Sequence, residues 1–275
     1  MSDDTSVWFD KYPGLAFERR DHGVLWMTIN RPDKYNATDA QLHKGLSEVW
    51  LDIDADDETS VVVVTGAGKA FSAGGDLEWI QGFTGDQRQV LEVMEEATDL
   101  VQRMVHCKKI IISAINGVAV GAGLAVALMA DISIMANEAR ISDGHLAIGV
   151  AAGDHATICW PLLCGLAKAK YYLLTADFVD GETADRIGLV SKAVPRDELL
   201  AEAERVANKI AQGPTAAARY TKRSLNLWMQ AAAPAFTASA ALEMLNFLGA
   251  EAAEGVAAAA EKRAPDFEAA RQASN

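Results

Sequence analysis

The sequence is poor in cysteine: its 275 residues include only Cys107, Cys159 and Cys164. No two of them form a Cys-x-x-Cys pair, so neither a zinc site nor a disulfide framework is indicated. We therefore expect no metal centre. Isolated thiols of this kind are typical of a reducing compartment, which favours a cytoplasmic protein.

Positive charge is also scarce. The chain has 25 lysines and arginines against 38 aspartates and glutamates, a net charge of −13 and an isoelectric point near 4.8. Proteins that bind nucleic acids need basic patches for the phosphate backbone. The charge balance therefore argues against a nucleic-acid partner.

A long uninterrupted apolar segment is missing as well. Residues 110–130 come nearest to one, but Ser113, Asn116 and three glycines interrupt them. A helix that crosses a bilayer needs about 20 predominantly apolar residues. Residues 1–10 are acidic and lack the apolar centre of a signal peptide. We expect no membrane partner.

The hydrophobic content and the pattern of apolar residues suit a globular α/β protein. Half of the residues are hydrophobic, enough for a substantial core. Apolar runs at residues 60–66 and 110–115 predict buried strands, and the patterns at 38–53 and 89–105 predict helices. Their alternation indicates β-β-α units with a mainly parallel sheet. We predict a core at residues 1–194 and a helical region at 195–275, whose apolar tail is typical of packing on another subunit or on its own domain.

The chain is organised around residues 110–125. A β-branched run leads through Asn116-Gly117 to Gly121-Ala122-Gly123, and a helical pattern follows at once. A helix start places free backbone N–H groups at one point, and small residues there let a ligand approach the main chain. Such a turn can hold an anion or an oxyanion, or can simply pack a strand against a helix. A second glycine-rich turn occupies residues 71–77.

These segments together resemble the crotonase superfamily, the enoyl-CoA hydratase/isomerase family, over about residues 7–267. The matching segments are Asn30-Arg31-Pro32 with Asn36-Ala37, residues 70–77, residues 115–123 with Ala130-Asp131, Leu173-Leu174-Thr175 with Ala184, and Gly188-Leu189-Val190. The resemblance implies a spiral of β-β-α units and a helical C-terminal region that forms trimers, often paired into hexamers. It also implies acyl-CoA substrates and no cofactor beyond coenzyme A itself.

Site residues follow from the same resemblance. It implies an oxyanion hole made by the backbone N–H groups of Gly75 and Ala122, where a thioester enolate needs donors. Ala122 can serve if its φ is negative. The resemblance places substrate or coenzyme A at Lys34, Ala37, Ala73 and Asp76. Trp79 and Trp160 either line an acyl pocket or belong to the core.

The chain departs from the hydratase pattern at the two catalytic glutamates, whose positions hold Ala125 and His145. Alanine cannot move a proton, so we predict that His145 and Asp154 replace the pair, within hydrogen-bond reach of each other. The carboxylate would then raise the basicity of the imidazole. The stretch from Asp143 to Leu162 resembles oxocamphor hydrolase, a relative that cleaves a β-diketone by retro-Claisen hydrolysis.

Other titratable groups carry weaker signals. Glu243 falls roughly where that relative has an active-site glutamate. The alternative interpretation is that Glu243 lies on a solvated helix face. His155 follows a residue that already has a role, and His43 is interpreted as structural. Three functions remain open: an acyl-CoA enzyme with an enolate intermediate, a C–C hydrolase of a cyclic β-dicarbonyl compound, and a non-catalytic acyl-CoA binder.

Overall fold

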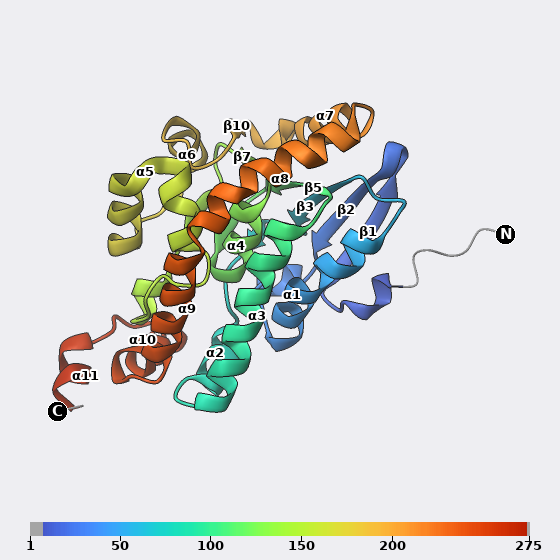
Figure 1. Cartoon of the computed structure of the whole chain (residues 1–275). Helices are drawn as coiled ribbons and strands as arrows, with labels where there is room; N and C mark the ends of the chain where they lie inside the picture. The colour runs from blue at the N-terminus through green and yellow to red at the C-terminus, as the bar shows by residue number, and fades with distance from the viewer. Residues whose placement is uncertain (1–7, 274–275) are drawn as a thin grey trace.

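A computed structural model of the chain describes residues 8–273. A six-stranded sheet forms its centre, and the strands can be followed by their labels in Figure 1. The strands are β1 (Leu15–Arg20), β2 (Val24–Ile29), β3 (Val61–Gly66), β5 (Ile110–Ile115), β7 (Ile132–Ala136) and β10 (Lys192–Val194), in the order β1-β2-β3-β5-β7-β10. Only β1 and β2 pair antiparallel, and the other neighbours are parallel. Because β3 and β5 are buried on both faces, they read as continuous apolar runs.

A second, smaller sheet carries the turns of interest. It consists of β4 (Ala70–Ser72), β6 (Val118–Val120), β8 (Arg140–Ser142) and β9 (Val179–Asp180), in that order. These strands have only two or three residues, too few for a periodic pattern, and sequence reasoning missed them. In the first unit both strands, β1 and β2, belong to the large sheet, whereas the pairs β3/β4, β5/β6 and β7/β8 each send one strand to each sheet before a helix follows. The predicted β-β-α units are thus confirmed.

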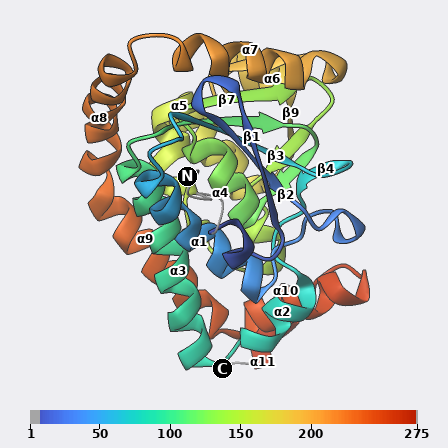
Figure 2. The same ribbon diagram turned by 90° about the vertical axis from the view of Figure 1, so that its right-hand side faces the viewer.

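The helices of the core begin where the sequence offers caps. They are α1 (Ala40–Ala55), α2 (Leu77–Phe83), α3 (Gln87–His106), α4 (Gly121–Met129), α5 (Ala156–Thr175) and α6 (Gly181–Arg186). The carboxylates of Asp39, Asp76 and Asp86 accept backbone N–H groups in the first turns of α1, α2 and α3. Helix α4 is almost entirely buried and lies in the middle of the molecule (Figure 2). The predicted break at Gly165 is a kink within α5, with φ of 77°.

The C-terminal region is helical, as predicted. Its helices are α7 (Leu199–Ala211), α8 (Thr215–Ala231), α9 (Ala233–Phe247), α10 (Ala250–Glu261) and α11 (Phe267–Ala273). Helix α7 packs on β3, β5 and β7, α9 packs on α3 and α5, and α10 packs on α2. Figure 1 shows α8 and α9 running along the molecule in front of the core. The tail thus packs on its own chain, while its role between subunits stays a prediction.

Two expectations concern the ends and the membrane. Most of the acidic segment at residues 1–10 lies outside the described residues, which begin at Trp8. Within residues 8–273, no helix is both long and apolar enough to cross a bilayer.

Candidate active site

The two glycine-rich turns lie side by side. One joins β4 to α2 and the other joins β6 to α4, and β4 and β6 are neighbours in the small sheet. A Cβ atom added to Gly121 would lie 3.5 Å from Cα of Gly74 and 3.8 Å from the amide nitrogen of Gly75. Gly74 and Gly121 have φ of 94° and 53°, which glycine adopts most readily. The fold therefore brings the two predicted oxyanion-hole positions together.

The amide of Ala122 is free to act as a donor. Ala122 lies in the first turn of α4, where an N–H group has no acceptor within the helix. Its φ is not in the positive range. Alanine at this position can therefore offer its N–H group, as the sequence analysis required. The positive end of the helix dipole lies at the same point and favours negative charge.

A cavity of about 160 Å³ opens on these turns. Its wall includes the backbone of both turns and apolar side chains from α2, α3 and α9, namely Leu77, Trp79, Ile80, Phe83, Val93, Ala97, Met244 and Phe247. Its polar residues are His43, Asp143, His145, Asp154 and Glu243. The predicted placement of His145 and Asp154 beside Gly75 and Ala122 is thus what the structure has.

The hydrogen-bond partner predicted for His145 is wrong. Nδ1 of His145 lies 2.9 Å from Oδ1 of Asp143, whereas its Nε2 lies 3.9 Å from Oδ2 of Asp154, too far for a hydrogen bond. The reason is local: Gly144, with φ of 78°, turns the chain so that the imidazole folds back onto the residue two positions earlier. Asp154 remains close enough to act through its charge.

Glu243 reaches the site from α9. Its Oε1 lies 3.4 Å from Nε2 of His145, and the side chain is buried. Gly153 permits this approach, because a Cβ there would lie 2.6 Å from Cβ of Glu243 and 2.3 Å from the carbonyl oxygen of Ser239. Of the two readings of Glu243, the solvated helix face is therefore wrong.

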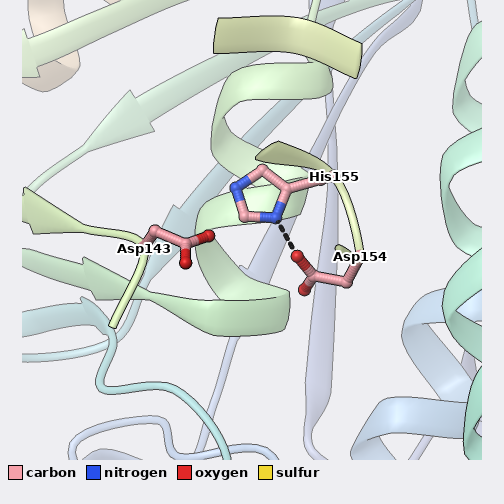
Figure 3. A group of neighbouring side chains, drawn as sticks. All are labelled: Asp143, Asp154 and His155. Atoms are coloured by element: carbon pink, nitrogen blue, oxygen red, sulfur yellow. Dashed lines mark hydrogen bonds and ion pairs between the residues drawn. The ribbon is translucent and has the colours of Figure 1, made fainter. Parts of the chain in front are cut away.

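Asp154 has a different partner, the neighbouring His155. Nδ1 of His155 lies 2.5 Å from Oδ1 of Asp154, and the imidazole is fully buried. Figure 3 shows Asp143 and Asp154 on either side of this ring. Within residues 8–273, no hydrogen-bond partner reaches Oδ2 of Asp143, Nε2 of His155 or Oε2 of Glu243. Two imidazoles and three carboxylates thus form one buried group of charges.

This arrangement shifts the pKa values. Burial would lower the pKa of His145, but the negative charges of Asp143, Asp154 and Glu243 outweigh it and raise that pKa well above its ordinary value. The pKa of His155 is raised in the same way, chiefly by Asp154. Burial raises the pKa of Glu243 to about 7, although His145 opposes the shift. Burial also acts to raise the pKa of Asp154, but the two imidazoles lower it.

Two sets of side chains could hold a metal ion. The ligand atoms of Asp143, Asp154 and His155, and those of His145, Asp154 and Glu243, lie within 4.8 Å of one another in each set. In both sets, however, a histidine nitrogen already faces a carboxylate at 2.5–3.4 Å. Each imidazole is thus already paired with a carboxylate, an arrangement that suits proton transfer.

The predicted coenzyme A positions divide between two places. Lys34 and Asp76 line an open groove of about 560 Å³, and Trp79 borders both this groove and the inner cavity. Ala73 lines the inner cavity. Ala37 lies one turn beyond Lys34, whose carbonyl accepts its N–H. A substrate could thus extend from the groove past Trp79 to the two turns.

Of the two alternatives for Trp160, packing in the core is the one found, and His43 has a place that its structural interpretation did not include. Trp160 belongs to the core: it is fully buried, with its ring 6.3 Å from that of Tyr172, and does not line the cavity. His43, interpreted as structural, does line it. Nothing in the sequence around His43, which lies on α1 one turn after the cap at Asp39, pointed to the cavity, because lone buried histidines are common in cores.

The chain is similar to known proteins over nearly its whole length. The profile of the family described as enoyl-CoA hydratase/isomerase matches residues 19–270. A probable enoyl-CoA hydratase from Mycobacterium bovis is 31% identical over 256 residues, which cover 90% of this chain and 95% of that protein.

Solved structures show the same similarity. An enoyl-CoA hydratase/isomerase from Mycobacterium paratuberculosis superposes with a TM-score of 0.86 at 31% identity, covering 90% of this chain and 99% of that one. A β-diketone hydrolase from the cyanobacterium Anabaena, bound to (S)-3-oxocyclohexyl acetic acid, superposes with a TM-score of 0.82 at 26% identity, covering 88% and 96%.

Proposed function

Because the chain belongs to the enoyl-CoA hydratase/isomerase family, we propose that it acts on an acyl-CoA thioester through an enolate intermediate. The thioester oxygen accepts hydrogen bonds from the amides of Gly75 and Ala122. These donors are fixed before the reaction and face the point where negative charge develops, which is where such stabilisation counts most. The thioester binds with coenzyme A along the groove of Lys34 and Asp76.

We propose Glu243 and His145 as the acid–base pair in place of the family's glutamates. A carboxyl group with a pKa near 7 can accept or donate a proton at neutral pH. The raised pKa of His145 makes it an imidazolium in the resting site, oriented by Asp143. His145 therefore acts as the acid, and Glu243 takes the role of base that sequence analysis predicted for His145.

For hydration of a C=C bond, the proton balance is simple. Glu243 removes a proton from water, and the resulting hydroxide adds to the β-carbon. The electron pair moves to the thioester oxygen, where the two amides hold the enolate. His145 then gives the α-carbon its proton, and Glu243 returns its own to His145. The observation that carries this proposal is that the Glu243–His145 pair and both turns border the same cavity.

A second candidate is supported by the β-diketone hydrolase among the similar structures. In a retro-Claisen reaction, water adds to one carbonyl carbon and the bond to the α-carbon breaks. One fragment leaves as a carboxylic acid, and the other leaves as an enolate that is protonated on carbon. The same base, acid and amides would serve, and Ala125 is no obstacle, because this reaction needs no second glutamate.

A substrate panel with mass spectrometry separates these functions. Consumption of crotonyl-CoA with loss of its ultraviolet absorbance supports hydration. Inertness toward crotonyl-CoA together with cleavage of β-ketoacyl thioesters or cyclic β-diketones supports C–C hydrolysis, since only that reaction splits the substrate. Binding of thioesters with no turnover across the panel would leave a non-catalytic binder and refute both.

We also propose a cytoplasmic homotrimer or dimer of trimers. Cys107 and Cys159 are buried free thiols, which suits a reducing compartment. Large apolar side chains are exposed along α8, among them Leu225 at 61% and Trp228 at 69%. Contiguous exposed apolar surface of this kind is typical of subunit contacts. The division into a core at residues 1–194 and an assembly region at 195–275 belongs to this proposal.

A further inference from the structure

Apart from the charged group around His145 and Glu243, the wall of the cavity includes one further polar side chain, that of His43. It projects from α1, is 4% exposed and lines the cavity. The acid–base pair belongs to other segments, the turn at His145 and helix α9. His43 therefore adds a second polar position to the substrate cavity.

His43 is held by an ionic partner on α3. Its Nδ1 lies 2.6 Å from Oε2 of Glu96. A carboxylate can only accept a hydrogen bond, so Nδ1 carries the proton and the donor role. The tautomer is thus fixed, and Nε2 is the nitrogen left for a further partner. In the neutral ring Nε2 accepts a hydrogen bond, and in the charged ring it donates one.

The rest of the wall near His43 is apolar. The ring lies 5.1 Å from that of Trp79, and α3 contributes Val93 and Ala97 to the same cavity. Once a substrate has displaced water, a purely hydrocarbon chain would leave a polar nitrogen of His43 without a partner. Buried polar groups without partners are costly, and a site built around one discriminates against ligands that cannot pair with it.

We propose that Nε2 of His43 binds an oxygen-bearing group, a hydroxyl or a carbonyl, on the acyl chain of the substrate. This inference rests on the proposed function, because it takes the acyl chain to lie in the cavity while the thioester lies at the two turns. It narrows the substrate class from acyl-CoA thioesters in general to those with an oxygen substituent on the chain. Glu96 is then a positioning residue that fixes the imidazole.

The test measures equilibrium binding by calorimetry, so it does not depend on turnover. The ligands are hexanoyl-CoA and its hydroxy- and oxo-derivatives with oxygen at different carbons. We expect the wild-type protein to bind the best oxygenated ligand about tenfold tighter than hexanoyl-CoA, the value of one buried hydrogen bond. His43→Leu should remove that preference, and Glu96→Gln should weaken it.

The control is His106→Leu, which replaces an exposed histidine at the end of α3, outside the cavity. This variant should keep the preference. Equal affinity of the wild-type protein for plain and oxygenated chains would overturn the inference while leaving the proposed function intact. Absence of binding by any thioester would reject the proposed function and the inference together. Circular dichroism verifies that each variant is folded.

Discussion

Nε2 of His145 lies 3.4 Å from Oε1 of Glu243, although the two residues come from distant parts of the chain. Both side chains are largely buried. Glu243 raises the pKa of His145 and His145 lowers that of Glu243, so each group favours the charged form of the other. A carboxyl group and an imidazole in this relation can exchange a proton at little cost.

The first prediction concerns Glu243→Gln. Glutamine keeps the shape of the side chain but cannot accept a proton, so kcat should fall by about 10²–10⁴-fold. KM should change little, because the thioester is held elsewhere. Steady-state kinetics on the substrate found in the panel measures both values. Glu268→Gln, at an exposed position on α11, is the matched control, and a fully active Glu243→Gln would exclude Glu243 as the base.

The second prediction compares Asp143→Asn with Asp154→Asn. Asp143 accepts the hydrogen bond of His145 at 2.9 Å, whereas Asp154 acts at 3.9 Å through charge alone. Removing either charge lowers the pKa of His145, and the alkaline limb of the kcat profile should move toward lower pH. The shift should be about one pH unit or more for Asp143→Asn. If Asp154→Asn moved the alkaline limb further than Asp143→Asn does, Asp154 would be the main partner of His145, as the sequence analysis predicted.

The third prediction concerns stability against pH. The pKa of Glu243 rises from 4.5 to about 7 on folding, so the folded protein binds an extra proton between these values. A raised pKa contributes stability below pH 4.5 that is lost as the pH rises through 7. Relative to Glu243→Gln, the wild-type free energy of unfolding should therefore fall by roughly 1–3 kcal/mol over this interval. Urea denaturation at fixed protein concentration measures it, and a constant difference would contradict the shift.

The fourth prediction tests the oxyanion hole with Ala122→Pro. Proline is tolerated in the first turn of a helix and removes one N–H donor there. We expect kcat to fall by about 10²–10³-fold with the fold retained. Ala216→Pro places the same change in the first turn of α8, away from the cavity, and should leave activity unchanged. Wild-type activity in folded Ala122→Pro would remove this amide from the mechanism.

The fifth prediction concerns assembly. Light scattering at micromolar concentration should give the mass of a trimer or a hexamer. Trp228→Glu, which places a charge on the exposed face of α8, should lower that mass, because burying an unpaired charge is costly. Gln230→Glu, in the last turn of the same helix, serves as the control for added charge. A stable wild-type monomer would refute the assembly.

Local structure could be predicted from the residues alone. Buried strands such as β3 follow from β-branched runs, and helix starts such as α1 follow from the cap at Asp39. The two glycine-rich turns and their following helices were likewise predictable, because only small residues suit a close approach of backbones. The replacement of the glutamates by Ala125 and His145 was also visible without a structure.

Which side chains meet in the site could not be predicted in this way, because it depends on the folded arrangement. Asp143, not Asp154, binds His145, because the φ of Gly144 sets the direction of one side chain. Glu243 and His43 reach the cavity because α9 and α1 pack beside it. Such pairings depend on how segments distant in the chain pack together, and that packing is set by the whole core and not by the residues nearby in sequence.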